Sequence, residues 1–111
     1  MSKLQCDLSE LPKGLVFKLA GQFGYSEMEE FEKHVKRMDS HNPSLVVLDL
    51  SGLKVITSAG IGALLRLQKT MSAKNCALRM AALPANIAEI FKLSRLSDVF
   101  QIAGSVAQAL V

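Results

Sequence analysis

The six residues 45–50, Leu-Val-Val-Leu-Asp-Leu, form a near-continuous apolar run. Such a run is typical of a central strand in a parallel sheet, because that sheet is covered on both faces and almost every side chain meets apolar surroundings. The run lies near the middle of a chain of 111 residues, which is about the length of one domain. We therefore expect a single domain, residues 1–111, built around a buried sheet.

Helical periodicity is found on both sides of this run. Before it, apolar residues recur at helical spacing at Met28, Phe31, Val35 and Met38. Ser26 and Glu29 have the spacing of a capping box and predict that this helix begins at Ser26 and ends before His41. A second helix is predicted from Ser58, as the N-cap, to about Ser72. Its apolar stripe is expected to include Ile61, Leu64, Leu65, Leu67 and Met71.

Shorter segments complete the pattern. Residues 3–8 and 14–20 read as a hairpin, and residues 21–24 are expected to end its second strand. A turn is expected at Ser51-Gly52. Residues 76–82 and 99–102 are predicted to be strands. Pro84 suits the first turn of a third helix, and Ser105 can cap a short final helix.

The resulting order of elements is β-β-α-β-α-β-α-β-α. An initial hairpin followed by alternating helices and strands predicts an α/β fold. We expect a mixed sheet of four to five strands, with a parallel interior and about four helices.

Composition excludes several classes of protein. The net charge of +3 is spread along the chain, and aromatic residues make up only 5% of it, so a basic nucleic-acid surface with stacking aromatics is not expected. Cys6 and Cys76 have no metal-like spacing and are expected to be half-buried, reduced thiols. No signal peptide or membrane-spanning run is apparent, which predicts a soluble cytoplasmic protein.

The sequence also lacks a catalytic constellation. There is no P-loop, no complete dinucleotide-binding glycine pattern and no nucleophile elbow. His34 and His41 are expected to be solvated or half-buried side chains rather than ligands or bases. We therefore predict neither an enzyme nor a bound metal or cofactor.

Residues 49–65, DLSGLKVITSAGIGALL, run from the buried strand into the start of the second helix. Gly60 and Gly62 both lie in that start, although glycine costs a helix about 1 kcal/mol relative to alanine. One explanation is close packing of the helix against the sheet or a loop. The other is a bare surface beside the Ser58 hydroxyl, which another protein can approach.

This segment resembles the signature of the STAS domain, in particular of the bacterial anti-sigma-factor antagonists. The matching residues are Asp49, Ser51, Gly52, Thr57, Ser58, Ala59 and Gly60. Residues 21–23, Gly-Gln-Phe, resemble the glycine that ends the family's second strand, and residues 96–102 resemble its Leu-x-x-x-Phe-x-Ile close. The chain differs from common family members at three positions: Thr57 and Gly24 replace aspartates, and Arg95 replaces a glycine.

The resemblance implies a partner-switching function. Unmodified antagonist binds an anti-sigma factor that is also a serine kinase of the histidine-kinase-ATPase fold, and so releases the target of that kinase. Phosphorylation at Ser58, with Thr57 as the fallback acceptor, breaks the complex, and a PP2C-type phosphatase resets it. The residues expected to contact the partner are Gly24, Asp49, Thr57, Ser58, Ala59, Gly60 and Ile61. The family acts mostly as monomers that form heteromeric complexes.

Two other functions remain open for such a domain. It could be a subunit that docks on the ATPase of an ABC transporter without a covalent switch. It could also bind a small ligand, either a nucleotide or a lipid.

Overall fold

The computed structural model describes residues 3–111, and these contain one five-stranded sheet with helices packed against it. The strands are β1 (Leu4–Leu11), β2 (Gly14–Phe23), β3 (Leu45–Ile56), β4 (Ala77–Ala81) and β5 (Gln101–Ala103). The helices are α1 (Met28–Asp39), α2 (Ser58–Ala73), α3 (Ala85–Leu93) and α4 (Val106–Ala109). Short 3-10 turns at Tyr25–Glu27 and Leu96–Asp98 precede α1 and β5. The predicted order of strands and helices is confirmed.

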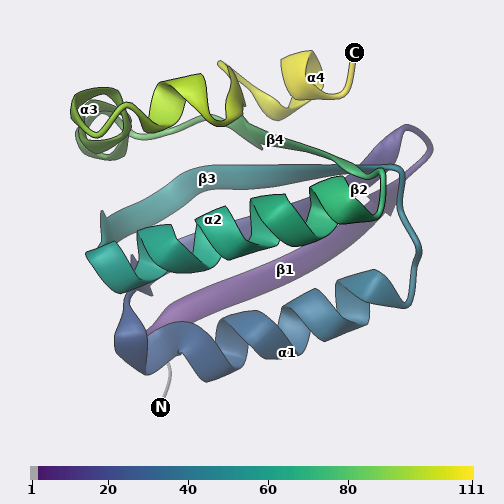
Figure 1. Cartoon of the computed structure of the whole chain (residues 1–111), viewed down its shortest axis with the longest axis horizontal. Helices are drawn as coiled ribbons and strands as arrows, with labels where there is room; N and C mark the ends of the chain where they lie inside the picture. The colour runs from purple at the N-terminus through teal and green to yellow at the C-terminus, as the bar shows by residue number, and fades with distance from the viewer. Residues whose placement is uncertain (1–2) are drawn as a thin grey trace.

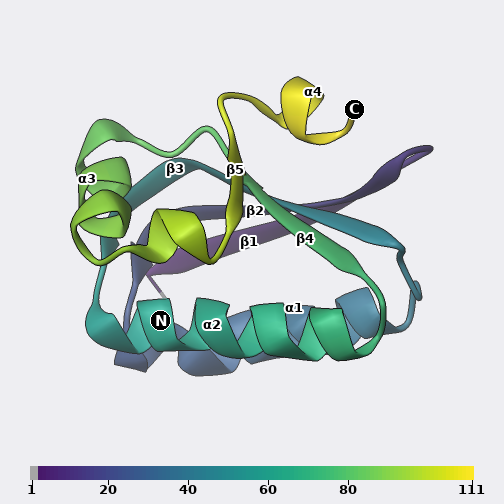
Figure 2. The same cartoon turned by 45° about the horizontal axis from the view of Figure 1, so that its top comes forward.

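The sheet is mixed, as predicted. Its strands lie in the order β1-β2-β3-β4-β5; β1 pairs antiparallel with β2, and every later pair is parallel. Helices α1 and α2 lie side by side on one face, and α4 lies on the opposite side (Figures 1 and 2). Helix α3 lies at the end of the sheet where β3 ends and α2 begins (Figure 1).

Strand β3 is central and covered on both faces. Val46, Leu48 and Leu50 join the main core with α1 and α2, whereas Val47 packs with Ala109 of α4 in a second, smaller cluster. All four strand residues are fully buried. The prediction from the apolar run is therefore confirmed, because the strand has no solvent-facing side over residues 46–48.

The predicted turn at Ser51-Gly52 is wrong, because β3 continues to Ile56. The strand instead contains irregularities in its pairing with β2, where two of its residues face one partner residue. Each extra residue reverses the alternation of sides, so Leu50, Leu53 and Ile56 are all buried although they are three residues apart. The apolar pattern of one strand with bulges therefore resembles the apolar pattern of two strands separated by a turn.

The predicted break at residues 21–24 is also too early, because β2 continues to Phe23. Gly21 adopts φ +97°, and a Cβ at this position would collide with the carbonyl oxygen of Lys3. Glycine therefore serves an irregularity inside the strand rather than its end.

Helix α1 begins later than predicted and with a different cap. The Ser26–Glu29 capping box does not form; instead, Glu27 Oε1 accepts a hydrogen bond from Gly24 N at 2.9 Å, and Glu27 N donates to Gly24 O at 3.1 Å. The predicted apolar stripe is confirmed, since Phe31 and Met38 are buried. Ser26 and Glu29 are exposed.

One histidine was misjudged from sequence. His34 is buried, its ring stacks on Phe17 with centroids 6.2 Å apart, and its Nδ1 lies 3.0 Å from Glu30 O. His41 is exposed, as expected. The imidazole of His34 completes the core-facing stripe of α1, which the spacing of purely apolar residues does not reveal.

Both cysteines are free thiols; Cys6 is half-buried, as expected, whereas Cys76 is buried. Burial raises the pKa of the Cys6 thiol to about 12, and the carboxylates of Glu30 and Asp7 add to the effect. Burial also raises the pKa of Cys76. Neither thiol has the lowered pKa of a reactive cysteine.

Between residues 3 and 111, no helix is both long and apolar enough to span a membrane.

Arg95 adopts φ +60° and ψ +20°, the left-handed conformation that glycine adopts without strain. We expect Arg95→Gly to raise the free energy of unfolding by up to about 1 kcal/mol, because the Cβ strain of about 1–2 kcal/mol exceeds the entropy lost by glycine. Lys92→Gly, three residues earlier in the exposed last turn of α3, should lower it by about 1 kcal/mol. Urea denaturation measures both, and a destabilised Arg95→Gly would contradict the assignment of strain.

Candidate functional site

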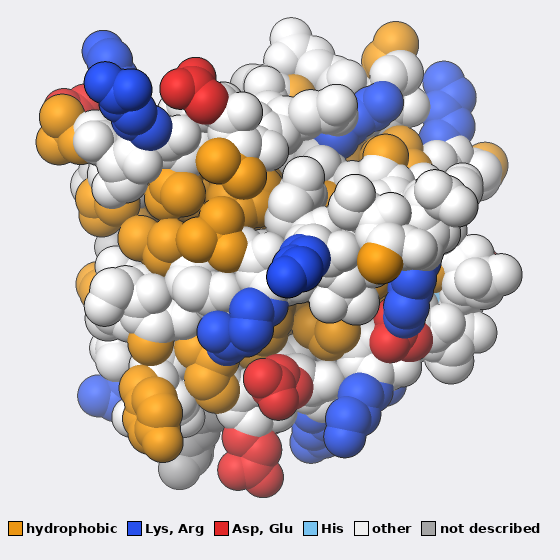
Figure 3. Space-filling view, in the orientation of Figure 1, with side chains coloured by type: hydrophobic (Ala, Val, Ile, Leu, Met, Phe, Trp, Pro, Cys, Tyr) orange, Lys and Arg blue, Asp and Glu red, His pale blue; other side chains and the backbone are white. Residues whose placement is uncertain are grey.

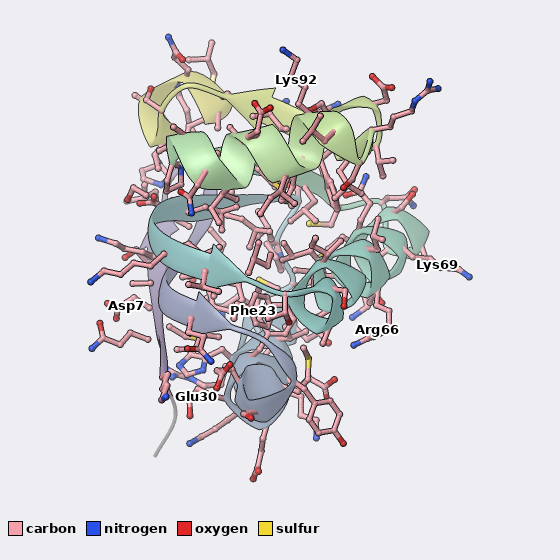
Figure 4. All side chains as sticks on the ribbon, turned by 90° about the vertical axis from the view of Figure 1, so that its left-hand side faces the viewer. Asp7, Phe23, Glu30, Arg66, Lys69 and Lys92 are labelled. Carbon is pink, nitrogen blue, oxygen red and sulfur yellow. The ribbon has the colours of Figure 1, made fainter. Side chains whose placement is uncertain are left out.

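The predicted site lies at the end of β3, where the chain passes directly into α2. Thr57 N donates a hydrogen bond to Phe23 O at 3.0 Å, which ties this junction to the end of β2. Figure 4 shows this end of the molecule, with Phe23 at the tip of its strand beside the start of α2. The junction therefore rests on two neighbouring parallel strands.

Thr57, not Ser58, is the N-cap of α2. Its backbone is extended, its carbonyl oxygen accepts from Ile61 N at 3.0 Å, and its Oγ1 accepts a long 3.5 Å hydrogen bond from Gly60 N. Ser58 is the first helical residue and is exposed. Within residues 3–111 the Ser58 hydroxyl makes no hydrogen bond, so no contact of the folded chain depends on it.

The two glycines of the helix start have different surroundings. A Cβ on Gly60 would lie 2.5 Å from Phe23 O and 2.9 Å from Ile56 Cγ1, distances that real side chains do not adopt. A Cβ on Gly62 would meet only Arg66 Nη1, at 3.6 Å. Close packing therefore explains Gly60, but it does not explain Gly62.

Gly24 lies against the same junction. A Cβ on Gly24 would lie 3.0 Å from Thr57 Oγ1 and 3.1 Å from Thr57 Cγ2. Its N–H is held by Glu27, whose side chain is almost fully buried at 2% exposure. The structure thus brings together two segments 33 residues apart, as the pairing of Gly24 with Thr57 in the predicted site requires.

Asp49 does not belong to this cluster. Thr57 follows it by eight positions, a distance of roughly 25 Å along a strand. Its Oδ1 accepts from Ser51 N at 3.0 Å. A Cβ on Gly52, the next residue of the motif, would lie 2.8 Å from Ala20 Cβ. These contacts shape the first irregularity of β3, so the Asp-x-Ser-Gly part of the motif has a structural role in the sheet.

The remaining predicted residues, Ala59 and Ile61, are half-buried, and Ile61 packs on the main core. Sequence reasoning missed two exposed apolar residues that lie close in sequence to Gly24 and Ser58. Tyr25, next to Gly24, is 84% exposed and Val55 is 48% exposed. Tyr25 is the chain's one tyrosine and directly follows Gly24, a signal that could have drawn attention to it.

Leu65 was expected to face the core but is 37% exposed. It lies seven residues after Ser58, so both side chains lie on one side of α2. Figure 3 shows hydrophobic side chains gathered on the face between α2 and α3. The exposed large hydrophobic residues of these two helices are Leu65 and Leu93. Helix α2 therefore carries exposed apolar surface on the side that faces α3.

The described part of the chain contains no group of three or more histidine, cysteine, aspartate or glutamate side chains placed to hold a metal ion. The chemistry available at the junction is that of the exposed Ser58 hydroxyl, which no hydrogen bond of the described residues engages, at the start of α2. Such an arrangement is suited to protein contact and to modification of that hydroxyl.

Comparison with known proteins agrees with this fold. An anti-sigma factor antagonist from Mycobacterium paratuberculosis superposes with a TM-score of 0.86 at 16% identity, covering 99% of this chain and 96% of that one. A protein from Thermotoga maritima gives a TM-score of 0.79 at 16% identity, covering 95% and 91%. The anti-sigma factor antagonist SpoIIAA in its unphosphorylated form gives 0.76 at 15% identity, covering 96% and 93%. The family model of the STAS domain matches residues 5–109. The chain therefore belongs to the STAS domain family.

Proposed function

We propose that this protein is an anti-sigma-factor antagonist that switches partners through Ser58. In its unmodified form it binds an anti-sigma factor that is also a serine kinase of the histidine-kinase-ATPase fold. Phosphorylation of Ser58 releases the complex, and a PP2C-type phosphatase restores the binding form. The similar solved structures that are described as anti-sigma factor antagonists support this role.

The observation that carries the proposal is the exposed, unoccupied hydroxyl of Ser58 at the first position of α2. The neighbouring Thr57 is a poorer site for phosphorylation. Its Oγ1 already accepts a hydrogen bond from Gly60 N and so caps the helix. Modification of Thr57 would remove that cap, whereas modification of Ser58 removes no contact of the fold. Ser58 is therefore the preferred phosphorylation site.

A phosphoryl group at Ser58 is compatible with the fold and incompatible with an apolar contact. It adds about −1.5 to −2 charges at pH 7, and the unpaired N–H groups at a helix start favour negative charge. Tyr25, next to Gly24, and Val55, three residues before Ser58, have exposed side chains that a partner at this junction would cover. Covering the charge as well would require its desolvation, and a tenfold loss of affinity takes only about 1.4 kcal/mol.

The direct test is intact mass measurement after incubation with ATP and a candidate kinase from the same genome. We expect one phosphate on the parent protein and on Thr57→Val, and none on Ser58→Ala. Phosphate that persists on Ser58→Ala would move the site elsewhere. Absence of phosphate with every kinase of that fold would contradict the switch, and co-purification with a transporter ATPase would then support the docking function.

Charge at position 58 should control binding. We expect Ser58→Asp to weaken the complex with the kinase at least tenfold, while Ser58→Asn, which has the same size without the charge, stays within a few-fold of the parent. The fold should be unaffected, because an acidic residue near a helix N-terminus is favourable by about 0.3–1 kcal/mol. Titration calorimetry and thermal denaturation measure the two effects. Equal affinities of the aspartate and asparagine variants would exclude charge as the control.

A further inference from the structure

Arg66 of α2 is directed toward the start of its own helix. Its Nη1 lies 3.6 Å from the place that a Cβ would occupy on Gly62, one turn earlier, and its Nη2 lies 3.9 Å from Met28 Sδ. Long side chains of a helix lean toward its N-terminus, so this direction is expected. Figure 4 shows Arg66 on the side of α2 that faces α1.

This guanidinium is not neutralised within the fold. Among residues 3–111 the structure contains one lysine–carboxylate ion pair, Lys74 with Asp39, and two histidine–carboxylate contacts, His34 with Glu30 and His41 with Glu10. None of them includes Arg66. Glu32 lines the same groove between α1 and α2 but forms no ion pair with Arg66. The contact with Met28 Sδ is a weak hydrogen bond, because a thioether is a poor acceptor. Arg66 is exposed and keeps most of its donors free.

Gly62 leaves the surface between Arg66 and Ser58 bare. The three residues are spaced by four, so they lie along one ridge of α2, and Gly62 is about 6 Å from Ser58 along the helix axis. Any side chain at position 62 would stand between the guanidinium and the Ser58 side chain. This gives Gly62 a role that close packing does not, since only Arg66 approaches it.

We propose that Arg66 binds the phosphoryl group of phosphorylated Ser58 across the bare surface of Gly62. The proposal rests on the modification of Ser58 proposed above. A guanidinium presents paired donors to phosphate oxygens, and the Met28 contact that it gives up is weak. In the unmodified protein Arg66 lies against Gly62 and Met28; in the phosphorylated protein it holds the phosphoryl group against the surface of α2.

The second ionisation of the phosphoryl group reports this contact. A nearby cation favours the doubly charged form and lowers its pKa from about 6. Phosphoserine installed at position 58 during translation makes the test independent of any kinase. We expect 31P NMR titration to give a pKa about half a unit lower in the parent protein than in Arg66→Gln. Gly62→Leu should also raise the pKa above the parent value, because the leucine side chain blocks the approach of Arg66 to the phosphoryl group.

Lys69→Gln is the matched control, since Lys69 is an exposed cation of the same helix that Figure 4 shows on a different side from Arg66. It should leave the pKa at the parent value. Equal pKa values in the parent and Arg66→Gln would overturn the proposal, as would an equal rise in Lys69→Gln. A failed phosphorylation by kinases would overturn the switch and leave this measurement valid, so the two results are separable.

Discussion

Gly60→Ala should lower the free energy of unfolding by about 2–3 kcal/mol, whereas Gly62→Ala, two residues later in the same helix, should raise it by about 0.5–1 kcal/mol. A Cβ at position 60 would be 2.5 Å from the carbonyl oxygen of Phe23, which already accepts the hydrogen bond from Thr57 N. The backbone of Phe23 cannot rotate out of the way as the end of a side chain can, so α2 would have to move away from the sheet. At position 62 the Cβ meets only the movable end of Arg66, so the helix propensity of alanine acts alone.

Urea denaturation of both variants under the same conditions measures this difference, and each variant is the control for the other. Gly60→Ala should also weaken partner binding, because moving α2 displaces Ser58. A neutral or stabilising Gly60→Ala would mean that the close approach of α2 to β2 is not a constraint on the fold. A destabilising Gly62→Ala would contradict the open surface beside that residue.

The fold was largely predictable because its signals are local. The stripe of α1 and the apolar run of β3 each report burial through spacing alone. The interruptions were misread for a physical reason. In β3, Ser51 and Gly52 have the composition of a turn, yet they lie at an irregular pairing inside a strand. Bulges and turns use the same residue types, so only the partner strand distinguishes them.

The site was predictable where it is continuous in sequence and not where it is assembled in space. Thr57 and Ser58 follow one another, so their position at a helix start could be predicted, although the cap was assigned to the wrong one of the two. The roles of Arg66 and Glu27 depend on a bare glycine surface and on a buried loop. Neither feature has a sequence pattern of its own, because each depends on residues that only the folded chain brings together.

Glu27→Ala should lower the free energy of unfolding by about 1–3 kcal/mol, because it leaves the buried Gly24 N–H without an acceptor. The same loop supports the modification site, since Gly24 lies against Thr57. We therefore expect weaker partner binding in Glu27→Ala even where the protein remains folded. Glu27→Gln keeps a carbonyl oxygen at this place and should recover most of the lost stability.

Glu29→Ala distinguishes this loop from the capping box that the sequence suggested. If Ser26 and Glu29 closed the start of α1, removal of the Glu29 carboxylate would cost about as much as removal of Glu27. In the structure Glu29 is exposed, and its loss should change the free energy of unfolding by less than about 0.5 kcal/mol. Urea denaturation of Glu27→Ala, Glu27→Gln and Glu29→Ala ranks the three. Equal losses of unfolding free energy in the two alanine variants would mean that Glu27 does not hold Gly24. The proposed connection between the start of α1 and the Ser58 junction would then be wrong.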